Sequence, residues 1–569
     1  MAAFPRELER LSEPACPSWA LLHLHGGEMR LTRFTIEGHA VLNDMDVEVR
    51  EHLVIIGAND VGKTSILRLL NLLLGATVQQ MYAGLTAADI RDGVEALVVT
   101  ATLGDFELED AGKFPFEIDA DDPYELVLHF EARVSDEDPD AITIQRFFPD
   151  SGNRRGLTRE QLQILGWRYL PATRASGVDA MEGRNSPIRT MIDNVNFGES
   201  LTDFEVLLEQ FNDKLEASDA LQNLRQEIAQ HLSRSVPRGY DAQSLAIRTA
   251  ADPSENPLQD VTIFLREGDA LKSLAEQSDG MRQLMSLTFF DLAQASANIV
   301  AVDEPEIHLH ASSQRTVATL FAESKRQRLV VTHSPYIVQR FEPRHVLVID
   351  PDSAARQLPE KSFTAVEKER LQWWSPQLLE GLTARRILFV EGLADRIIVE
   401  AAAAKIGLNL DRLGITVFSL DGATKFIHVL NIVGRNGFKL PICGLCDADM
   451  ENTWSGNLGI APKKMEENGF FVARKELEYE YARAFGPRAC AEKLVAEGAW
   501  REKGILQSTG AADLDSLTAE QVGDFLTSSS DRKVPAARAL APHLTREVLD
   551  ASPALGGLMR YLESLDPAK

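Results

Sequence analysis

Two groups of residues in this chain have the types and the spacing to do chemistry. In the first, a short apolar run is followed by Gly57, Gly62, Lys63 and Thr64 in the pattern G-x-x-x-x-G-K-T. Glycines let backbone N–H groups turn toward a phosphate, a lysine brings positive charge to the outer phosphate oxygens, and a threonine hydroxyl can ligate Mg²⁺. This spacing predicts a phosphate-binding loop. The residues expected to contact a nucleotide there are Gly57, Asn59, Gly62, Lys63, Thr64 and Ser65.

Later apolar runs end in side chains that would complete a nucleotide site. The run at residues 299–302 ends in Asp303 and Glu304, and the run at residues 328–332 ends in His333. One carboxylate can hold Mg²⁺ while the other orients an attacking water, which is the division of roles that ATP hydrolysis requires. A lone histidine at a strand end is more often a packed or capping residue. The position of His333 in the order of these motifs, and its spacing from them, favour a location near the γ-phosphate.

The second group lies in the C-terminal third, where short apolar strands alternate with helical patterns. Glu391, Asp447 and Asp449 follow such strands, and Asp395 follows Glu391 at the start of a helical pattern. The carboxyl ends of parallel strands meet at one edge of a sheet, so we expect the four acids to meet there. Carboxylates brought together repel unless cations neutralise them, and ligands that are all oxygen favour Mg²⁺ or Mn²⁺ over zinc. Such a cluster suits metal-dependent cleavage of a phosphodiester.

The elements that must position the first group form two sheets and a helical segment. Apolar patterns predict strands at residues 30–36, 42–49, 53–56, 96–103 and 124–130. Together they indicate an antiparallel sheet layered against a parallel one. A change to three- and four-residue apolar spacing across residues 197–236 predicts an amphipathic helix or helical hairpin. This helix is either a layer of the same domain or a dimerisation arm, and the spacing leaves both open.

Composition excludes some classes of protein. The net charge of −26 argues against a surface coated in positive charge, although local basic patches and metal ions can still serve nucleic-acid binding. No apolar run is long enough to span a membrane, and four cysteines provide no disulfide framework, so we expect a cytoplasmic protein without membrane contact. Cys443 and Cys446 have the spacing of a redox or zinc pair. Because no second pair accompanies them, core packing is the favoured interpretation.

The motifs of the first group, taken together, resemble an ABC-type ATPase head of the SMC and RecF kind. They are the phosphate loop, Ser278 with Gly280, the pair of Asp303 and Glu304, and His333. The resemblance implies that Ser278 and Gly280 of one head contact ATP held by another head, so that the protein forms a homodimer. It also implies that Glu304 is the hydrolytic base and His333 the switch histidine.

The acids of the C-terminal third resemble those of the Toprim domain. An ABC-type head followed by a Toprim domain is similar to the OLD (overcoming lysogenization defect) family, which includes the nuclease subunit of the Gabija antiphage system. Glu391 and Asp395 fit the E-x-x-x-D form of that family's first Toprim motif. The ligands of the nuclease metal ions that the resemblance implies are Glu391, Asp395, Asp447, Asp449 and Glu478.

Residues 471–480 look like the later strand of that family, which carries a further acid. If this segment is extended, Glu476, Glu478 and Glu480 share one face. Glu478 is favoured among the three because it follows a leucine, as in the Leu-Glu pair of the family. The resemblance also makes Lys533 the cation near the scissile phosphate.

Three more positions are candidates through the resemblance. ATPase heads of this kind use a glutamine to sense Mg²⁺, and Gln79 and Gln80 are both candidates. Residues 169–174 are similar to a segment common in the OLD family, in which Arg174 would sense nucleotide or DNA.

The expected fold class is α/β: an ABC/SMC-type ATPase head with a helical dimerisation insertion, followed by a Toprim parallel α/β domain with C-terminal helices. The expected boundaries are an N-terminal extension at 1–28, the head at 29–350 with its insertion at about 190–250, a connector at 351–385, and the Toprim domain with its helical region at 386–569.

The resemblance implies an ATP-regulated, metal-dependent DNA endonuclease that acts in antiphage defence. Its expected cofactors are ATP and Mg²⁺ or Mn²⁺ at both sites, and its expected partners are DNA, further copies of itself, and a helicase or other defence protein encoded nearby. One alternative is a DNA-repair ATPase of the SMC and RecF kind whose Toprim domain does not cut. Another is a topoisomerase-like activity, but none of the eight tyrosines lies in a recognisable nucleophile context.

Overall fold

The computed structural model describes most of the chain in two compact units. The described residues are 29–172 (without 107, 119–124, 136, 139 and 150–153), 198, 200–219, 221–223, 226, 264–267, 270–273, 277–293, 297–359, 376–422 and 425–566. The larger unit comprises Gly27–Tyr169, Ala297–Glu306 and Gln314–Lys569, and the smaller comprises Met1–Gly26, Leu170–Ser296 and Ile307–Ser313. The residues predicted to form the ATPase site, from Gly57 to His333, are therefore divided between the two units.

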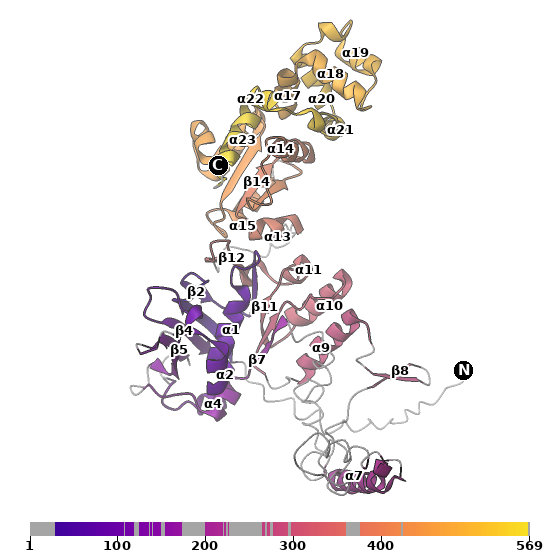
Figure 1. Cartoon of the computed structure of the whole chain (residues 1–569). Coiled ribbons are helices and arrows are strands. Elements are labelled where there is room, and N and C mark those ends of the chain that lie inside the picture. The colour runs from indigo at the N-terminus through magenta and orange to yellow at the C-terminus, as the bar shows by residue number, and fades with distance from the viewer. Residues whose placement is uncertain are drawn as a thin grey trace, which may run out of the picture. The chain divides into compact units, whose positions relative to one another are not determined.

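The first sheet of the larger unit is antiparallel throughout (Figure 1). Its strands, in spatial order, are β2 (Met45–Glu48), β1 (Arg30–Glu37), β4 (Leu97–Gly104), β5 (Leu126–Val134) and β6 (Ile142–Phe147). Alternate residues of β4 are buried, which is the pattern of a sheet with one face on the core.

The second sheet is mostly parallel. Its strands, in spatial order, are β13 (Ala355–Gln357), β12 (Val346–Ile349), β3 (His52–Gly57), β11 (Gln327–Val331), β10 (Ile299–Asp303) and β7 (Trp167–Leu170). Every residue of β3, β10 and β11 is buried, as expected for central strands covered on both faces. Helix α1 (Lys63–Leu74) contributes to one apolar core with both sheets. The prediction of an antiparallel sheet layered against a parallel one is confirmed.

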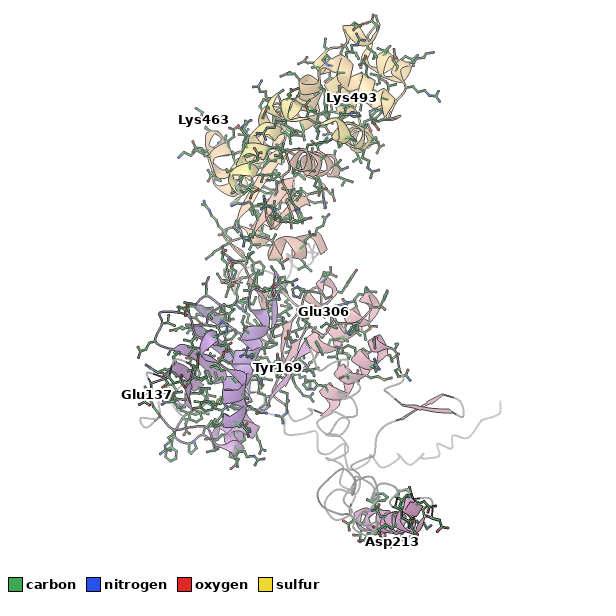
Figure 2. All side chains as sticks on the ribbon, viewed as in Figure 1. Glu137, Tyr169, Asp213, Glu306, Lys463 and Lys493 are labelled. Atoms are coloured by element: carbon green, nitrogen blue, oxygen red, sulfur yellow. The ribbon has the colours of Figure 1, made fainter. Side chains whose placement is uncertain are left out.

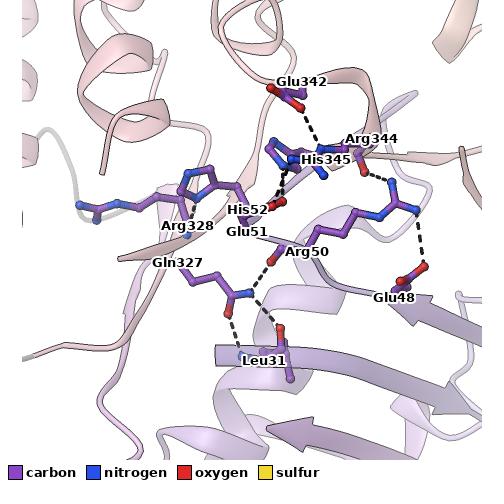
Figure 3. A network of polar contacts seen from close by, with 10 residues as sticks. All are labelled: Leu31, Glu48, Arg50, Glu51, His52, Gln327, Arg328, Glu342, Arg344 and His345. Atoms are coloured by element: carbon purple, nitrogen blue, oxygen red, sulfur yellow. Dashed lines mark hydrogen bonds and ion pairs between the residues drawn. The ribbon is translucent and has the colours of Figure 1, made fainter. Parts of the chain in front are cut away.

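A polar network joins the two sheets at the amino ends of the parallel strands (Figure 3). The side-chain amide of Gln327 donates to the carbonyls of Leu31 and Arg50 at 2.8 and 2.7 Å and accepts from the Leu31 N–H at 2.8 Å. Next to it, His345 Nε2 lies 2.9 Å from Glu51 Oε2. These bonds satisfy buried polar groups and connect the two sheets at the edge opposite the phosphate loop.

The Toprim sheet is parallel and lies in the same unit. Its strand order is β15 (Ile415–Ser419), β14 (Arg386–Val390), β16 (Ile442–Cys446) and β17 (Phe470–Val472). The helices that follow the first three strands are α14 (Leu393–Lys405), α15 (Phe426–Val433) and α16 (Glu451–Leu458). Trp454 of α16 stacks on Phe426 of α15 with ring centroids 4.1 Å apart, which fixes these two helices against each other.

Seven helices complete the C-terminal part of the described chain. They are α17 (Leu477–Phe485), α18 (Pro487–Ala496), α19 (Glu502–Thr509), α20 (Ala519–Thr527), α21 (Ser530–Leu540), α22 (Arg546–Asp550) and α23 (Pro553–Ser564). Their buried residues share a core with α14 and with the Toprim strands. The expected connector, residues 351–385, supplies β13 to the head sheet and also contains α13 (Pro376–Thr383).

The smaller unit contains α7 (Ser200–Ala217), the hairpin of β8 (Phe264–Glu267) and β9 (Ala270–Ser273), and α9 (Asp279–Ala293). Helix α7 carries the first part of the predicted apolar stripe, and Phe204, Leu207 and Phe211 are exposed on it. The second part, at residues 227–236, lies outside the described residues. The choice between a helical layer and a dimerisation arm therefore stays open. No helix in the described part of the chain is both long enough and apolar enough to cross a membrane.

Candidate functional site

The phosphate loop runs from the end of β3 to the start of α1. A Cβ on Gly57 would lie 2.5 Å from the carbonyl oxygen of Ile349, so only glycine fits there. Gly62 caps α1 with φ of +90°, a left-handed conformation that glycine adopts without strain. Both glycines are therefore required by the backbone path that exposes the loop amides.

The cation and the hydroxyl of the loop lie beside the acid of β10. Lys63 is buried, its Nζ donates to the Ala58 carbonyl at 2.5 Å, and burial lowers its pKa. Thr64 Oγ1 lies 3.3 Å from Asp303 Oδ1. Burial, opposed by the hydrogen bond from Thr64, raises the pKa of Asp303 to about 6. A hydroxyl and a carboxylate paired in this way, next to a phosphate loop, fit a Mg²⁺ ion bound with nucleotide.

Glu304 and His333 face each other across neighbouring strands. His333 Nε2 lies 3.7 Å from Glu304 Oε1, and burial followed by the charge of Lys63 lowers the histidine pKa. Glu304 has φ of +47°, a strained conformation for a residue other than glycine, and its N–H donates to the Val331 carbonyl at 2.9 Å. The backbone thus directs this carboxylate toward the histidine.

Two residues that support His333 and Asp303 were not predicted from the sequence, and Figure 2 labels both. Glu306 accepts from Thr332 Oγ1 at 2.8 Å and from the His333 N–H at 2.5 Å, so it fixes the strand end that carries the histidine. The Tyr169 hydroxyl hydrogen-bonds Asp303. The second acid of the run after β10 was a usable signal for Glu306. Tyr169 begins the segment at residues 169–174 that resembles one of the OLD family, but only Arg174 was predicted to act there.

The other residues predicted to contact nucleotide lie at helix starts or outside the described residues. Ser278 and Gly280 lie at the start of α9 in the smaller unit, where a Cβ on Gly280 would come within 2.9 Å of the His308 carbonyl oxygen. Gln80 accepts from the N–H of Thr77 at 2.8 Å and so caps α2 (Val78–Gly84). Arg174 lies outside the described residues.

Carboxylates from separate elements of the Toprim domain meet at the carboxyl edge of its sheet. Glu391, after β14, accepts from the Asp447 N–H at 2.7 Å. Asp447, after β16, in turn accepts from the Leu477 N–H at 3.1 Å, and Asp395 accepts from the Gly392 N–H at 2.9 Å. These bonds fix the direction of each carboxylate. Asp449 is exposed beside them and its charge contributes to a raised pKa of Glu391.

Lys533 of α21 enters the same cluster. Its Nζ lies 2.7 Å from Glu476 Oε2, 3.5 Å from Glu478 Oε2 and 4.0 Å from Asp447 Oδ2. Only the resemblance to the OLD family predicted this lysine near the scissile phosphate. The structure brings it together with the acids expected to hold the metal ions.

The interpretation of residues 471–480 as one strand is wrong. The strand ends at Val472, Glu476 caps the following helix, and Glu478 and Glu480 lie in the first turn of α17. Neighbouring even positions share a face in a strand but not in a helix. Glu478 therefore points to Lys533, whereas Glu480 accepts from the Arg474 N–H at 3.1 Å, from Ser552 Oγ at 2.7 Å and from the Ala554 N–H at 3.0 Å.

The electrostatics of the cluster fit a divalent cation. Burial and the neighbouring carboxylates raise the pKa of Asp447 to about 9 and that of Asp395 to about 7, and burial also raises the pKa of Glu478. Glu478 Oε2 is buried and accepts no hydrogen bond from the described residues. Oxygen donors under mutual repulsion are suited to Mg²⁺ or Mn²⁺. Among the described residues, however, no three His, Cys, Asp or Glu side chains are already arranged around one ion position.

A further acid lies at this edge. Asp421 follows β15, has φ of +46° and accepts from Ser419 Oγ at 2.9 Å, and the next N–H, of Gly422, donates to the Glu391 carbonyl at 3.3 Å. Its position at a strand end was the available signal. Cys443 and Cys446 are buried in β16, where burial raises the pKa of the Cys443 thiol to about 12, so both behave as core residues.

Comparison with known proteins follows the same division of the chain. Residues 53–339 match a family model whose description names an AAA domain and the AbiEii toxin of a Type IV TA system. Residues 382–449 match the model of the overcoming lysogenization defect protein-like TOPRIM domain. The first match spans half of the chain, and the second covers the strands that carry Glu391 and Asp447.

Relatives of similar length carry nuclease names. The chain is 25% identical over 446 residues to "OLD nuclease" of Thermus scotoductus, covering 74% of this chain and 80% of that protein. It is 20% identical over 432 residues to "Endonuclease GajA" of Bacillus cereus, covering 70% and 72%.

Solved structures resemble the two parts separately. The C-terminal region of the Burkholderia pseudomallei OLD protein is 25% identical and covers 32% of this chain and 99% of that one, with a TM-score of 0.27. The Smc head domain from Pyrococcus furiosus is 17% identical and covers 60% and 100%, with a TM-score of 0.36. Superpositions at these scores add no support, and the assignment rests on the family models and relatives: this chain belongs to the OLD family.

Proposed function

We propose that this protein is an ATP-regulated, Mg²⁺- or Mn²⁺-dependent DNA endonuclease. The observation that carries the proposal is the cluster at the Toprim edge, where the buried carboxylates of Asp447 and Glu478, both with raised pKa values, lie within 4.0 Å of Lys533. Such charge is costly to bury for fold stability alone, and it suits phosphodiester chemistry. The nuclease names of two relatives that align with most of this chain support the same function.

In this proposal the nuclease ions are held by Glu391, Asp395, Asp447, Asp449 and Glu478. Divalent ions at such a site activate the attacking water and stabilise the leaving oxygen. The chain's own residues orient the site: Glu391 accepts from the Asp447 N–H and so holds the ends of two adjacent strands together. Lys533 places positive charge next to the carboxylates, where the scissile phosphate would lie.

The head would bind ATP and Mg²⁺ through the phosphate loop, Thr64 and Asp303. Glu304 would act as hydrolytic base, with His333 within 3.7 Å of it to sense the γ-phosphate. Ser278 and Gly280 would contact ATP of a second copy, which makes a homodimer or larger homo-oligomer the working form. A cytoplasmic role in antiphage defence, with a helicase or another defence protein as partner, is proposed from the family.

A nicking assay tests the proposal. Supercoiled plasmid is incubated with the purified protein and Mg²⁺ or Mn²⁺, without nucleotide, with ATP and with a non-hydrolysable analogue. We expect wild type to cut in at least one condition and Asp447→Ala to cut roughly 100-fold less or not at all. Glu467→Ala removes an exposed acid elsewhere in the Toprim domain and is the matched control. A wild-type protein that never cuts in any metal and nucleotide condition contradicts the nuclease function.

One observation favours a second function, a DNA-repair ATPase whose Toprim domain does not cut. Lys533 already neutralises part of the acidic cluster, as a structural cation would, and no three acids surround an ion position in the described residues. Under this alternative Lys533→Met destabilises the protein but no variant changes cutting, because there is none to change. The nicking assay separates the two functions.

A further inference from the structure

A second hollow of the Toprim domain lies away from the acidic cluster. It has a volume of about 420 Å³ and is lined by the ends of α15 and α16, by the loop that leads into β16, and by Asn468 and Phe470 at the start of β17. Ile442 begins β16 and Asp447 follows its end, so the hollow and the cluster lie at opposite edges, separated by the strand's length of roughly 15 Å. Its volume is within the range of small-molecule sites, about 300–1,000 Å³.

The charge of this hollow is opposite to that of the protein. Its lining contains the two cations Arg435 and Lys439 and no carboxylate, in a chain whose net charge is −26. Neither cation forms an ion pair within the described residues, and both are exposed. The lining also contains four side-chain amides, those of Asn431, Asn436, Asn457 and Asn468. Cations without acids, beside amides that can donate and accept, suit a ligand that combines an anion with a polar ring.

The loop that carries the two cations is rigidly formed. The Phe438 N–H donates to the Ile432 carbonyl at 2.7 Å, and the Leu440 N–H donates to the Val433 carbonyl at 2.8 Å. A Cβ on Gly437 would lie 1.8 Å from the Ile432 oxygen, so the turn requires glycine. Lys439 itself has φ of +55°, which is strained for lysine. The backbone positions from which the two cationic side chains extend are therefore fixed by the loop.

The remaining walls fit the other half of such a ligand. Helices α15 and α16 both end here, at Gly434 and Gly459. The Ile432 and Val433 carbonyls at the end of α15 already accept from the loop, so the C-terminus of α16 is the wall that offers carbonyl oxygens rather than N–H groups. Carbonyls disfavour a bare anion but accept from ring N–H and amino groups. Leu440, Ile442 and Phe470 supply apolar surface for the face of a ring. The amides, the α16 carbonyls and the apolar surface together suit a nucleobase better than a simple anion.

We propose that this hollow binds a nucleoside phosphate, with the phosphate on Arg435 and Lys439 and the base against the amides, carbonyls and apolar surface. The ligand is either a free nucleotide or the terminal nucleotide of a DNA strand, which present the same chemistry. This site is separate from the phosphate loop of the head and from the acidic cluster, and its occupancy does not depend on whether the protein cuts DNA.

The test measures binding to the full-length chain carrying Lys63→Ala, which weakens the nucleotide site of the head. The probes are the four deoxynucleoside monophosphates, inorganic phosphate, and a short single DNA strand with a 5′-phosphate. Isothermal titration calorimetry measures the binding of each probe. We expect at least one monophosphate to bind, and the additional pair of changes Arg435→Ala and Lys439→Ala to weaken it at least tenfold. The matched control is Lys405→Ala with Lys503→Ala, which removes the same charge from exposed positions elsewhere in the domain.

Each outcome decides a part of the proposal. Tighter binding of the 5′-phosphorylated strand than of any monophosphate assigns the site to a DNA end, and the reverse assigns it to a free nucleotide. No binding of any probe, equal binding by the Arg435 and Lys439 variant, or equal affinity for inorganic phosphate and the monophosphates overturns it. If the double variant of Arg435 and Lys439 unfolds the loop, Asn468→Asp is the second test. It adds one carboxylate to the hollow without changing the volume and should weaken the binding of the monophosphate.

Discussion

At the scale of single residues, the acidic cluster depends on one lysine. Lys533 contacts Glu476 and lies within 4.0 Å of Glu478 and Asp447, and all three are at least half-buried. Removing a cation from such a group leaves negative charge that water cannot fully solvate. A divalent cation bound by the same carboxylates would neutralise that negative charge.

Lys533→Met should therefore lower the stability of the metal-free protein by about 1–3 kcal/mol, discounted for the partial exposure of the lysine. Mn²⁺ should raise the thermal unfolding midpoint of this variant more than that of wild type, and Lys533→Arg should stay close to wild type in stability. The measurement is thermal unfolding in EDTA and in Mn²⁺. Equal unfolding midpoints for wild type and Lys533→Met in both conditions would show that Lys533 does not stabilise the acidic cluster.

Glu478 and Glu480 give a matched pair of isosteric changes. Glu480 accepts three hydrogen bonds, so Glu480→Gln turns an amide N–H₂ toward donors and should cost about 1–3 kcal/mol while leaving metal-dependent cutting intact. Glu478→Gln removes a charge from a repelling cluster, so it should keep or raise stability and abolish cutting. Urea unfolding and plasmid nicking on the same samples check both. If Glu480→Gln abolishes cutting and Glu478→Gln leaves it intact, Glu480 rather than Glu478 is the metal ligand.

At the scale of elements, continuous apolar runs predicted the central strands of the head because such strands are buried on both faces. The same reasoning failed at residues 471–480, where acids at every second position fit a strand. The segment is a strand and then a helix because Leu477, Tyr481 and Ala482 pack at helical spacing against the C-terminal helices. That packing surface comes from residues far along the chain, so local spacing could not show it.

The candidate sites divide in the same way. The phosphate loop and the acids after β10, β14 and β16 could be predicted because each follows a strand in a recognisable pattern. Lys533 and Tyr169 could not be predicted from the residues alone, because they reach their sites from α21 and β7 through tertiary contacts. Only resemblance to the family singled out Lys533.

The histidines at the amino end of β3 should make the stability of the fold depend on pH. Burial lowers the pKa of His52 to about 4 and lowers that of His345, and Glu51, Arg328 and Arg344 surround the pair. Unfolded histidine has a pKa near 6.5, so between about pH 6.5 and pH 4 the unfolded chain binds protons that the folded chain does not. The stability that His52 contributes is therefore complete above pH 6.5 and is lost as pH falls toward 4, by about 3 kcal/mol.

Replacing this histidine should flatten the pH profile. His52→Gln keeps an acceptor for the Arg328 N–H, which donates to His52 Nδ1 at 3.2 Å, but cannot be protonated. The slope of the thermal unfolding midpoint between pH 4 and 6.5 should be smaller in this variant than in wild type. His310→Gln, at an exposed position, is the control and should keep the wild-type slope. An unchanged slope in His52→Gln would assign the acid sensitivity to other groups.

At the scale of the larger unit, contacts near His333 join the head to the Toprim domain. Arg356 of β13 donates to the Lys439 carbonyl at 2.9 Å. Helix α13, which precedes the Toprim sheet, shares with His333 and Ser334 the lining of a cavity of about 300 Å³, to which it contributes Leu379, Glu380 and Thr383. A change at His333 can therefore reach α13 through the residues that line this cavity.

Leu379→Ala should weaken this link while every residue of both candidate active sites stays in place. The side chain is buried, and its truncation enlarges the cavity that it shares with His333 and Ser334, at a cost of about 2–4 kcal/mol. The ratio of cutting rates with and without ATP should move toward one, while Mn²⁺-dependent cutting without nucleotide persists. Leu549→Ala, buried in the C-terminal helices, matches the loss of volume and should leave the ratio unchanged. A wild-type ratio in Leu379→Ala would exclude α13 as the link.

The central claim is that the Toprim edge is a metal-dependent nuclease site distinct from the ATPase site. The most direct measurement follows plasmid cutting in Mn²⁺ and ATP hydrolysis on the same preparations of wild type, Asp447→Asn and Glu304→Gln. We predict that Asp447→Asn loses cutting and keeps hydrolysis, while Glu304→Gln loses hydrolysis and keeps the capacity to cut. Cutting by Asp447→Asn at the wild-type rate, or no cutting by wild type in any condition, would contradict the claim.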